Sequence, residues 1–137
     1  AMRGSADYAI FAADPADPAS ARLLWQGVGA VGPPDISNDG RTILVSRSIS
    51  NRENRLMLLD VASASVRPVD IPGGPARYES PRFIRDGAAI LAISNNGSDV
   101  RRLVEINVAS GALRTISPEL RWDVEGYDLS DDGRILA

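Results

Sequence analysis

The sequence predicts an all-β protein, and three patterns carry that prediction. Modules in the chain of 137 residues recur about every 47 residues. Each repeat divides into short runs rich in Ile, Val and Leu, which are too short for ordinary helices and typical of strands. Asp-Gly and Asn-Gly pairs separate these runs and supply the positive φ that tight hairpin turns require. We therefore expect antiparallel hairpins throughout the chain.

Two modules with a common offset define the repeat. The first surrounds an Asp-Gly pair whose glycines, Gly40, Gly87 and Gly133, lie 47 and 46 residues apart. The second is the segment 55–63, whose pattern Arg-Leu-x-x-x-Asp/Asn-Val-Ala-Ser returns at 102–110. Residues 8–25 contain a looser copy of this second module. Because repeats of this period are typical of propellers and related arrays, we expect a repeat architecture.

Four strands joined by three hairpins are expected in each repeat. In the second repeat these strands cover residues 81–85, 88–94, 101–108 and 112–116. The second run of each repeat, such as 43–45, is apolar on both faces, which a strand needs only where both faces of its sheet are covered. Four-stranded antiparallel sheets packed face to face in series make a β-propeller.

The repeat divides the chain into five segments. Residues 1–5 are expected to be an expression-vector remnant, and residues 6–33 the second half of a blade and an inter-blade loop. Two whole blades follow over 34–78 and 79–120, and 121–137 supply the first half of another. The fold class is thus a partial β-propeller of about three blade equivalents. Since seven such blades need about 330 residues, we expect the chain to be a piece of a longer protein.

The composition excludes most catalytic chemistry. The chain has no His, Cys or Lys, and all 15 basic residues are Arg. This removes Ser-His-Asp, Cys-His and Ser-Lys centres, Schiff-base lysines, and the usual ligands of zinc, copper and haem. Carboxylate chemistry from the 18 Asp and Glu, or binding without chemistry, remains. We assign no catalytic, cofactor-binding or metal-binding residue and expect no cofactor.

Two motifs resemble known sites but have a simpler structural interpretation. Residues 27–32 spell G-x-G-x-x-G, yet Pro33 and Pro34 follow and disfavour the helix that a dinucleotide site needs. We expect an inter-blade loop there. The pair Trp122-Asp123 precedes an expected first strand, whereas in WD repeats this pair ends a third strand.

Other polar groups also have structural explanations. Asn96-Gly97-Ser98 matches a glycosylation sequon but also suits a hairpin tip. Asp128, Asp131 and Asp132 lack the spacing of an EF-hand loop, and the last of them belongs to an Asp-Gly turn. Paired-carboxylate catalysis would draw on the five glutamates, and nothing in their spacing brings two together across a cleft. These are Glu53, Glu79, Glu105, Glu119 and Glu125.

Charge, hydropathy and the half blades limit the classes of partner that we expect. The net charge of −3 argues against a nucleic-acid partner, and no apolar run reaches the roughly 18 residues of a membrane helix. Without a signal peptide the expected location is cytoplasmic, with the periplasm left open. The unpaired edges of the half blades predict self-association. The alternatives for it are a six-bladed dimer that swaps halves, adventitious strand pairing, and aggregation.

The repeats resemble those of TolB-like propellers, and more closely the N-terminal propeller of the prolyl oligopeptidase family of serine peptidases. The likeness rests mainly on residues 121–134 and 78–83. It implies a propeller without chemistry that caps an α/β-hydrolase domain of the parent chain and restricts access to small peptides. No catalytic residue carries over, since this chain has neither His nor a G-x-S-x-G elbow. A TolB-like scaffold for protein–protein interaction, with no enzyme attached, is the alternative.

Overall fold

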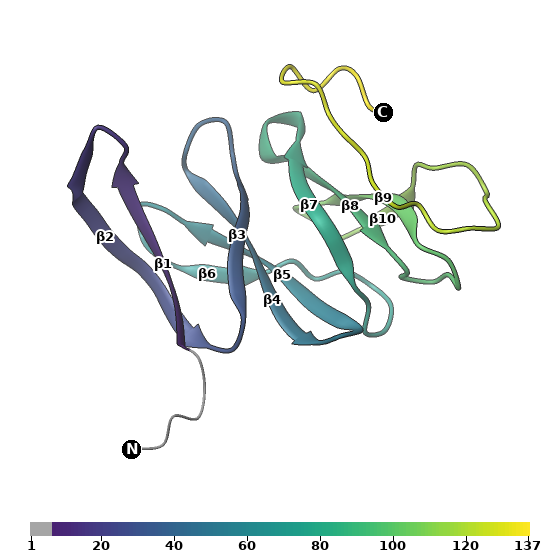
Figure 1. The fold of residues 1–137 in the computed structure, drawn as a ribbon, viewed down its shortest axis with the longest axis horizontal. Coiled ribbons are helices and arrows are strands. Elements are labelled where there is room, and N and C mark those ends of the chain that lie inside the picture. The colour runs from purple at the N-terminus through teal and green to yellow at the C-terminus, as the bar shows by residue number, and fades with distance from the viewer. Residues whose placement is uncertain (1–6) are drawn as a thin grey trace.

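The computed structural model describes residues 7–137, and the predicted all-β fold class is confirmed (Figure 1). The vector remnant expected at 1–5 lies outside the described residues. Within those residues, the regular structure consists of ten strands and one short 3-10 turn. None of the described residues forms a helix with the length and apolar character to cross a membrane.

The strands form three antiparallel sheets in chain order. A hairpin of two strands comes first, and two four-stranded blades follow. The hairpin comprises β1 (Asp7–Asp14) and β2 (Asp17–Val28). Blade 1 comprises β3 (Val31–Ile36), β4 (Thr42–Ser50), β5 (Glu53–Asp60) and β6 (Val66–Pro68). Blade 2 comprises β7 (Tyr78–Ile84), β8 (Ala89–Ser94), β9 (Arg102–Asn107) and β10 (Leu113–Thr115), with the 3-10 turn η1 (Arg85–Gly87) between β7 and β8.

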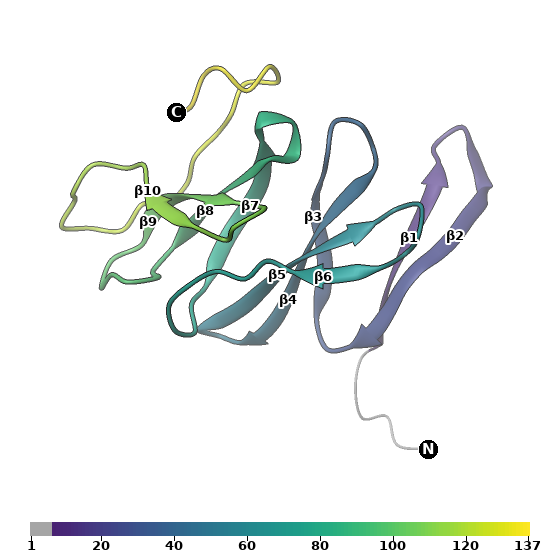
Figure 2. The ribbon, with the colours of Figure 1, turned by 180° about the vertical axis from the view of Figure 1, so that it is seen from behind.

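The two blades have the same strand register. Leu44 of β4 lies opposite Leu58 of β5, and the residues 47 positions later, Leu91 and Glu105, lie opposite each other in β8 and β9. Figures 1 and 2 show the first strands, β3 and β7, side by side, and the last strands, β6 and β10, on the other side of the molecule. After blade 2, residues 127–137, called here the C-terminal segment, form the isolated bridge between Leu129 and Leu136. The sequence repeat is therefore a repeat of structure.

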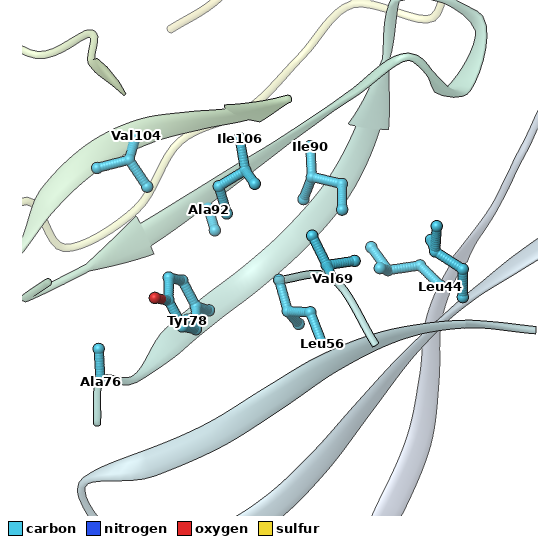
Figure 3. Close-up of a cluster of buried hydrophobic side chains, with 10 residues drawn as sticks. Leu44, Leu56, Val69, Ala76, Tyr78, Ile90, Ala92, Val104 and Ile106 are labelled. Carbon is cyan, nitrogen blue, oxygen red and sulfur yellow. The ribbon is translucent and has the colours of Figure 1, made fainter. Parts of the chain in front are cut away.

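Apolar side chains fill both spaces between the sheets. One cluster lies between the hairpin and blade 1, and the other lies between blades 1 and 2 (Figure 3). Side chains alternate along a strand, so Ile43 and Val45 face the hairpin whereas Leu44 faces blade 2. β8 is buried at every position. The strands predicted to be apolar on both faces are therefore covered on both sides.

Some element boundaries differ from those expected. β3 begins at Val31 rather than at residue 34, because Val31 is buried against the hairpin. The two prolines fit inside this edge strand since its pairing is interrupted between Gly32 and Asp35. The expected inter-blade loop over the G-x-G-x-x-G residues is therefore short: β2 ends at Val28, and no helix follows.

Turns occur at all three Asp-Gly pairs, and one differs in form. In the turns of Asp39 and Asp132 a serine hydroxyl donates to the aspartate Oδ1 at 2.7 Å, and the glycine N–H bonds the serine carbonyl at 2.8 Å. Blade 2 has Ile84 where the other repeats have serine. Without that hydroxyl the chain forms η1, in which Asp86 itself adopts a φ of 54°.

Substitutions at Gly111 and Ala64 can test the contact between blade 2 and the loop that contains Asp70. They occupy the same turn of successive blades, and each N–H bonds the carbonyl of the residue four positions earlier. Both have positive φ, but a Cβ on Gly111 would lie only 1.7 Å from the carbonyl oxygen of Asp70. We expect Gly111→Ala to lower the free energy of unfolding by at least about 2 kcal/mol in urea denaturation.

The matched change Ala64→Gly removes a Cβ from the left-handed region. Its relief of strain offsets the added backbone entropy, so we expect a change below about 1 kcal/mol. A Gly111→Ala protein as stable as the parent would contradict the close approach of blade 2 to the loop that contains Asp70.

Candidate binding site on the first strands

A charged side chain recurs at one position of successive first strands. Asp35 of β3, Arg82 of β7 and Asp128 of the C-terminal segment lie 47 and 46 residues apart. Asp35 Oδ2 accepts a hydrogen bond from the N–H of Phe83 at 2.7 Å, which joins blade 1 to blade 2. Arg82 Nη1 lies 3.4 Å from Asp128 Oδ1, which joins blade 2 to the C-terminal segment. Each contact therefore links one repeat to the next.

Asp35 and Arg82 line a polar hollow of about 420 Å³ between the two blades and the C-terminal segment. The hollow is lined by the ends of β3 and β7, by η1 and by the turn 130–133. Both signs of charge are present. The charged lining residues are Asp35, Arg82, Arg85, Asp86, Asp131 and Asp132. Because β3 and β7 are edge strands of their sheets, backbone groups also face this side.

A second hollow, of about 550 Å³, lies at the opposite ends of the same strands. Tyrosine and proline side chains dominate its lining, with Arg77 and Glu79 beside them. These rings belong to Tyr8, Pro33, Pro34, Tyr78 and Pro81. The two ends of the first strands therefore differ, since one is charged and the other is largely apolar.

Asn54 fixes the separation of the blades at this second hollow. Its Nδ2 donates to Ser46 Oγ at 2.8 Å and to the carbonyl of Tyr78 at 2.9 Å, and its Oδ1 accepts from the N–H of Tyr78 at 2.6 Å. The side chain is buried and both ends of its amide are engaged. Asn54 is therefore part of the structure of the blade contact rather than a group available to a ligand.

Tyr127 attaches the C-terminal segment to blade 2. Its Oη lies 2.5 Å from the carbonyl oxygen of Ser80 and 3.2 Å from that of Leu91, so the hydroxyl donates into the irregular part of β7. Ser80 adopts a φ of 50°, which is uncommon for a residue with a Cβ. Burial raises the pKa of Tyr127 to about 12.

The candidate acids are paired with arginines. Glu53 lies 3.5 Å from Arg55. Glu79 and Asp123 share Arg101, at 2.7 and 3.5 Å. These exposed pairs contribute little to stability.

Glu105 is the one buried acid of this group of candidates. It lies 2.8 Å from Arg85 Nη1 and also contacts Arg114 Nε. The interactions found for Glu119 and Glu125 among the described residues include no such pair. The glutamates that form ion pairs are therefore paired with arginines, and none of these pairs contains a second carboxyl group.

The remaining motifs have structural roles. Asn96 of the sequon donates from Nδ2 to the carbonyl of Pro72 and to Tyr78 Oη, both at 2.9 Å. Asp123 accepts from the N–H of Arg101 at 2.6 Å. The Ser130 hydroxyl holds the pKa of Asp132 below its ordinary value. Over residues 7–137, no three acidic side chains are grouped closely enough to hold a metal ion.

No family model and no curated protein matches the chain. Several solved structures are similar to it in fold. TolB from Acinetobacter baumannii is 20% identical with a TM-score of 0.65, over 85% of this chain and 28% of that one. A structure from a study of two prolyl endopeptidases is 17% identical with a TM-score of 0.61, over 90% and 21%. A protein assigned as TolB from Agrobacterium tumefaciens is 14% identical with a TM-score of 0.60, over 85% and 51%.

The chain has the fold of part of a β-propeller. Similarity to TolB and to a prolyl endopeptidase confirms, at the level of fold, the resemblance drawn from the repeats. The chain spans between about a fifth and a half of the length of these structures. At these identities the comparison establishes the architecture of the chain.

The raised pKa of Tyr127 gives a test of how the C-terminal segment is placed. Because burial disfavours the phenolate, the tyrosine stays neutral in the folded chain until the pH approaches 12. The stabilising contribution of the neutral form is complete below the unfolded pKa of about 10 and is lost as pH rises through 12. Burial also raises the pKa of Tyr78, so in an absorbance titration of tyrosinate we expect Tyr127→Phe to reduce the absorbance change near pH 12 by that of one tyrosine. An unchanged absorbance change near pH 12 in Tyr127→Phe would contradict this placement.

Proposed function

We propose that this chain is a non-catalytic propeller segment of a prolyl-oligopeptidase-like serine peptidase, where it controls the access of peptides and docks against the hydrolase domain. The observation that carries the proposal is the polar hollow at the ends of β3 and β7. It combines Arg82 and Arg85 with several carboxylates, and it lies beside the edges of two strands. A peptide has charged ends and a hydrogen-bonding backbone, so such a surface can select it without chemistry.

Two of the candidate glutamates have arginine partners that suit a structural role better than a catalytic one. A carboxyl general acid needs an environment that keeps its proton, such as an apolar pocket or a neighbouring carboxylate. Glu105 is buried but has arginines on two sides, and Glu79 has Arg101. Because guanidinium groups engage both glutamates, these pairs support a role in structure and binding.

The second hollow is the surface we assign to domain docking. Tyr8, Tyr78 and the proline rings supply apolar area, while Arg77 and Glu79 lie at its edge. Aromatic side chains bordered by polar groups are typical of protein interfaces. One end of the first strands would thus meet the peptide and the other the neighbouring domain.

A TolB-like scaffold that binds partner proteins is the second candidate. The similarity in fold to two TolB structures, with TM-scores of 0.65 and 0.60, supports this candidate. The same two surfaces would then both be protein interfaces. The candidates differ in whether a hydrolase domain is encoded with the propeller.

Reading the gene beyond the codon for Ala137 separates the candidates. A frame that continues into G-x-S-x-G followed by Asp and His supports the peptidase, whereas one that ends after further propeller repeats supports the scaffold.

In the peptidase we expect Arg82→Glu to raise KM for peptides about 3- to 10-fold with kcat retained, by a change of about 1 kcal/mol in binding. The matched change Arg67→Glu, on the outer strand β6, should have no such effect. Equal KM values for the two variants would contradict control of access at the hollow.

A further inference from the structure

The first strands of both blades are interrupted at the same place. The register of β7 with β8 skips Ser80 and Pro81. The register of β3 with β4 skips the residues 47 positions earlier, Pro33 and Pro34. A residue that leaves the ladder in this way turns its backbone carbonyl toward groups other than the neighbouring strand. The two blades therefore have equivalent irregular sites, which can be compared residue by residue.

In blade 2 a tyrosine of the next repeat occupies this site. The Tyr127 Oη lies 2.5 Å from the carbonyl oxygen of Ser80 and 3.2 Å from that of Leu91. The tyrosine is half-buried, and Pro81, which follows Ser80 in the interrupted part of the strand, is buried. Tyr127 thus brings a hydrogen-bond donor at the end of an apolar ring to the interrupted strand.

At the equivalent site of blade 1 the next repeat supplies a proline. Pro81 stands at the repeat position of Tyr127, 46 residues earlier, and it has neither a hydroxyl nor an aromatic ring. The acceptors that correspond to those of blade 2 are the carbonyls of Pro33 and Leu44. Pro33 and Pro34 are exposed, whereas Pro81 is buried. All three prolines line the second hollow, whose volume of about 550 Å³ exceeds that of a tyrosine side chain.

We propose that this part of the second hollow, formed by Pro33, Pro34 and Pro81 and called here the blade 1 site, binds a tyrosine side chain of the neighbouring domain. The inference rests on the proposed function, which assigns the second hollow to domain docking. The phenol hydroxyl donates to the carbonyl of Pro33 as that of Tyr127 donates to Ser80, and the ring packs on the prolines. Tyrosine suits such an interface because its ring is apolar and its hydroxyl needs a partner.

The charged groups near the blade 1 site favour an uncharged side chain over the end of a peptide. Glu79 is paired with Arg101 at 2.7 Å. Arg77 Nη1 donates to the carbonyl of Ser50 at 3.0 Å. Because both charged groups already have partners in the chain, the amino or carboxyl end of a peptide would have to compete for them. A tyrosine within a folded domain brings no such charge to the site.

Amide NMR of the chain as it exists tests the proposal with N-acetyl-L-tyrosinamide, a tyrosine blocked at both ends. We expect saturable shifts at the backbone amides that flank the prolines, those of Gly32, Asp35 and Ser80. The affinity should be about 5-fold higher than that of N-acetyl-L-phenylalaninamide, which lacks the hydroxyl. L-Tyrosinamide, with a free amino group, should bind no more tightly than the blocked probe.

Three results of this titration would overturn the proposal. They are the lack of saturable shifts at these amides, equal affinities for the tyrosine and phenylalanine probes, and tighter binding of the probe with the free amino group, which would indicate a peptide end as the occupant. The gene beyond Ala137 tests the proposed function separately, so either can fail without the other.

Pro81→Tyr tests the comparison between the blades. At the repeat position of Tyr127 the new ring fills the blade 1 site from within the chain, so we expect the affinity for N-acetyl-L-tyrosinamide to fall at least about 10-fold. The matched change Pro18→Tyr, at an exposed proline of the hairpin, should leave the affinity unchanged. A folded Pro81→Tyr chain that binds the probe like the parent would overturn the proposal.

Gly32→Phe keeps the test decisive if Pro81→Tyr fails to fold. Gly32 lines the second hollow, and a Cβ there would meet no atom within 4 Å, so the ring enters open space. Gly74 gives a Cβ the same freedom outside the lining of the hollow, which makes Gly74→Phe the control. We expect only Gly32→Phe to lose binding of the probe. Equal affinities of the two variants would contradict binding at the blade 1 site.

Discussion

The rest of this structure depends on the burial of both faces of each sheet. Ile43 and Val45 of β4 need cover on one side, and Leu44 needs it on the other. Burial of one such side chain contributes about 1.5–3 kcal/mol, so a sheet covered on one face alone would lose much of its stability. A blade therefore requires a neighbour, and that neighbour presents the same requirement on its far face. The repeat is the sequence-level form of this requirement.

Apolar packing alone defines poorly the angle and the distance between neighbouring sheets. Polar contacts between the sheets fix both. Asn54 joins β5 to Tyr78, Asn96 joins the β8–β9 hairpin to Pro72 and Tyr78, and Asp35 bonds the N–H of Phe83. These contacts lie toward the first strands and their turns. These contacts hold the first strands, β3 and β7, in fixed positions. Because the broad faces of the sheets are used for packing, the edges of these strands remain as a surface for binding.

Local features of the fold could be predicted, and long-range ones could not. The Asp-Gly turns follow from the conformations that glycine allows, and the strand register follows from hairpins of similar length. The start of β3 could not be read locally, because Val31 joins the strand through burial against the hairpin. The shape of η1 depends on the absence of one hydroxyl at Ile84.

The candidate site shows the same division. The shared repeat position of Asp35, Arg82 and Asp128 is visible in the aligned repeats, but the spacing of Asp128 from Asp131 and Asp132 indicated only an aspartate cluster. The pairing of Glu105 with Arg85 and Arg114 joins residues from separate strands and turns, so spacing alone could not reveal it.

Native-state hydrogen exchange of the backbone amides tests most directly whether packing on both faces stabilises this protein. If it does, the amides of β4 and β8 exchange only through global unfolding, with the same free energy as denaturant unfolding. Amides on the outer edge of each blade, formed by the short strands β6 and β10, should open with far lower free energy. Exchange from β4 as fast as from that edge would contradict the account, since a strand at the centre of the stack would then derive no protection from the sheets on either side.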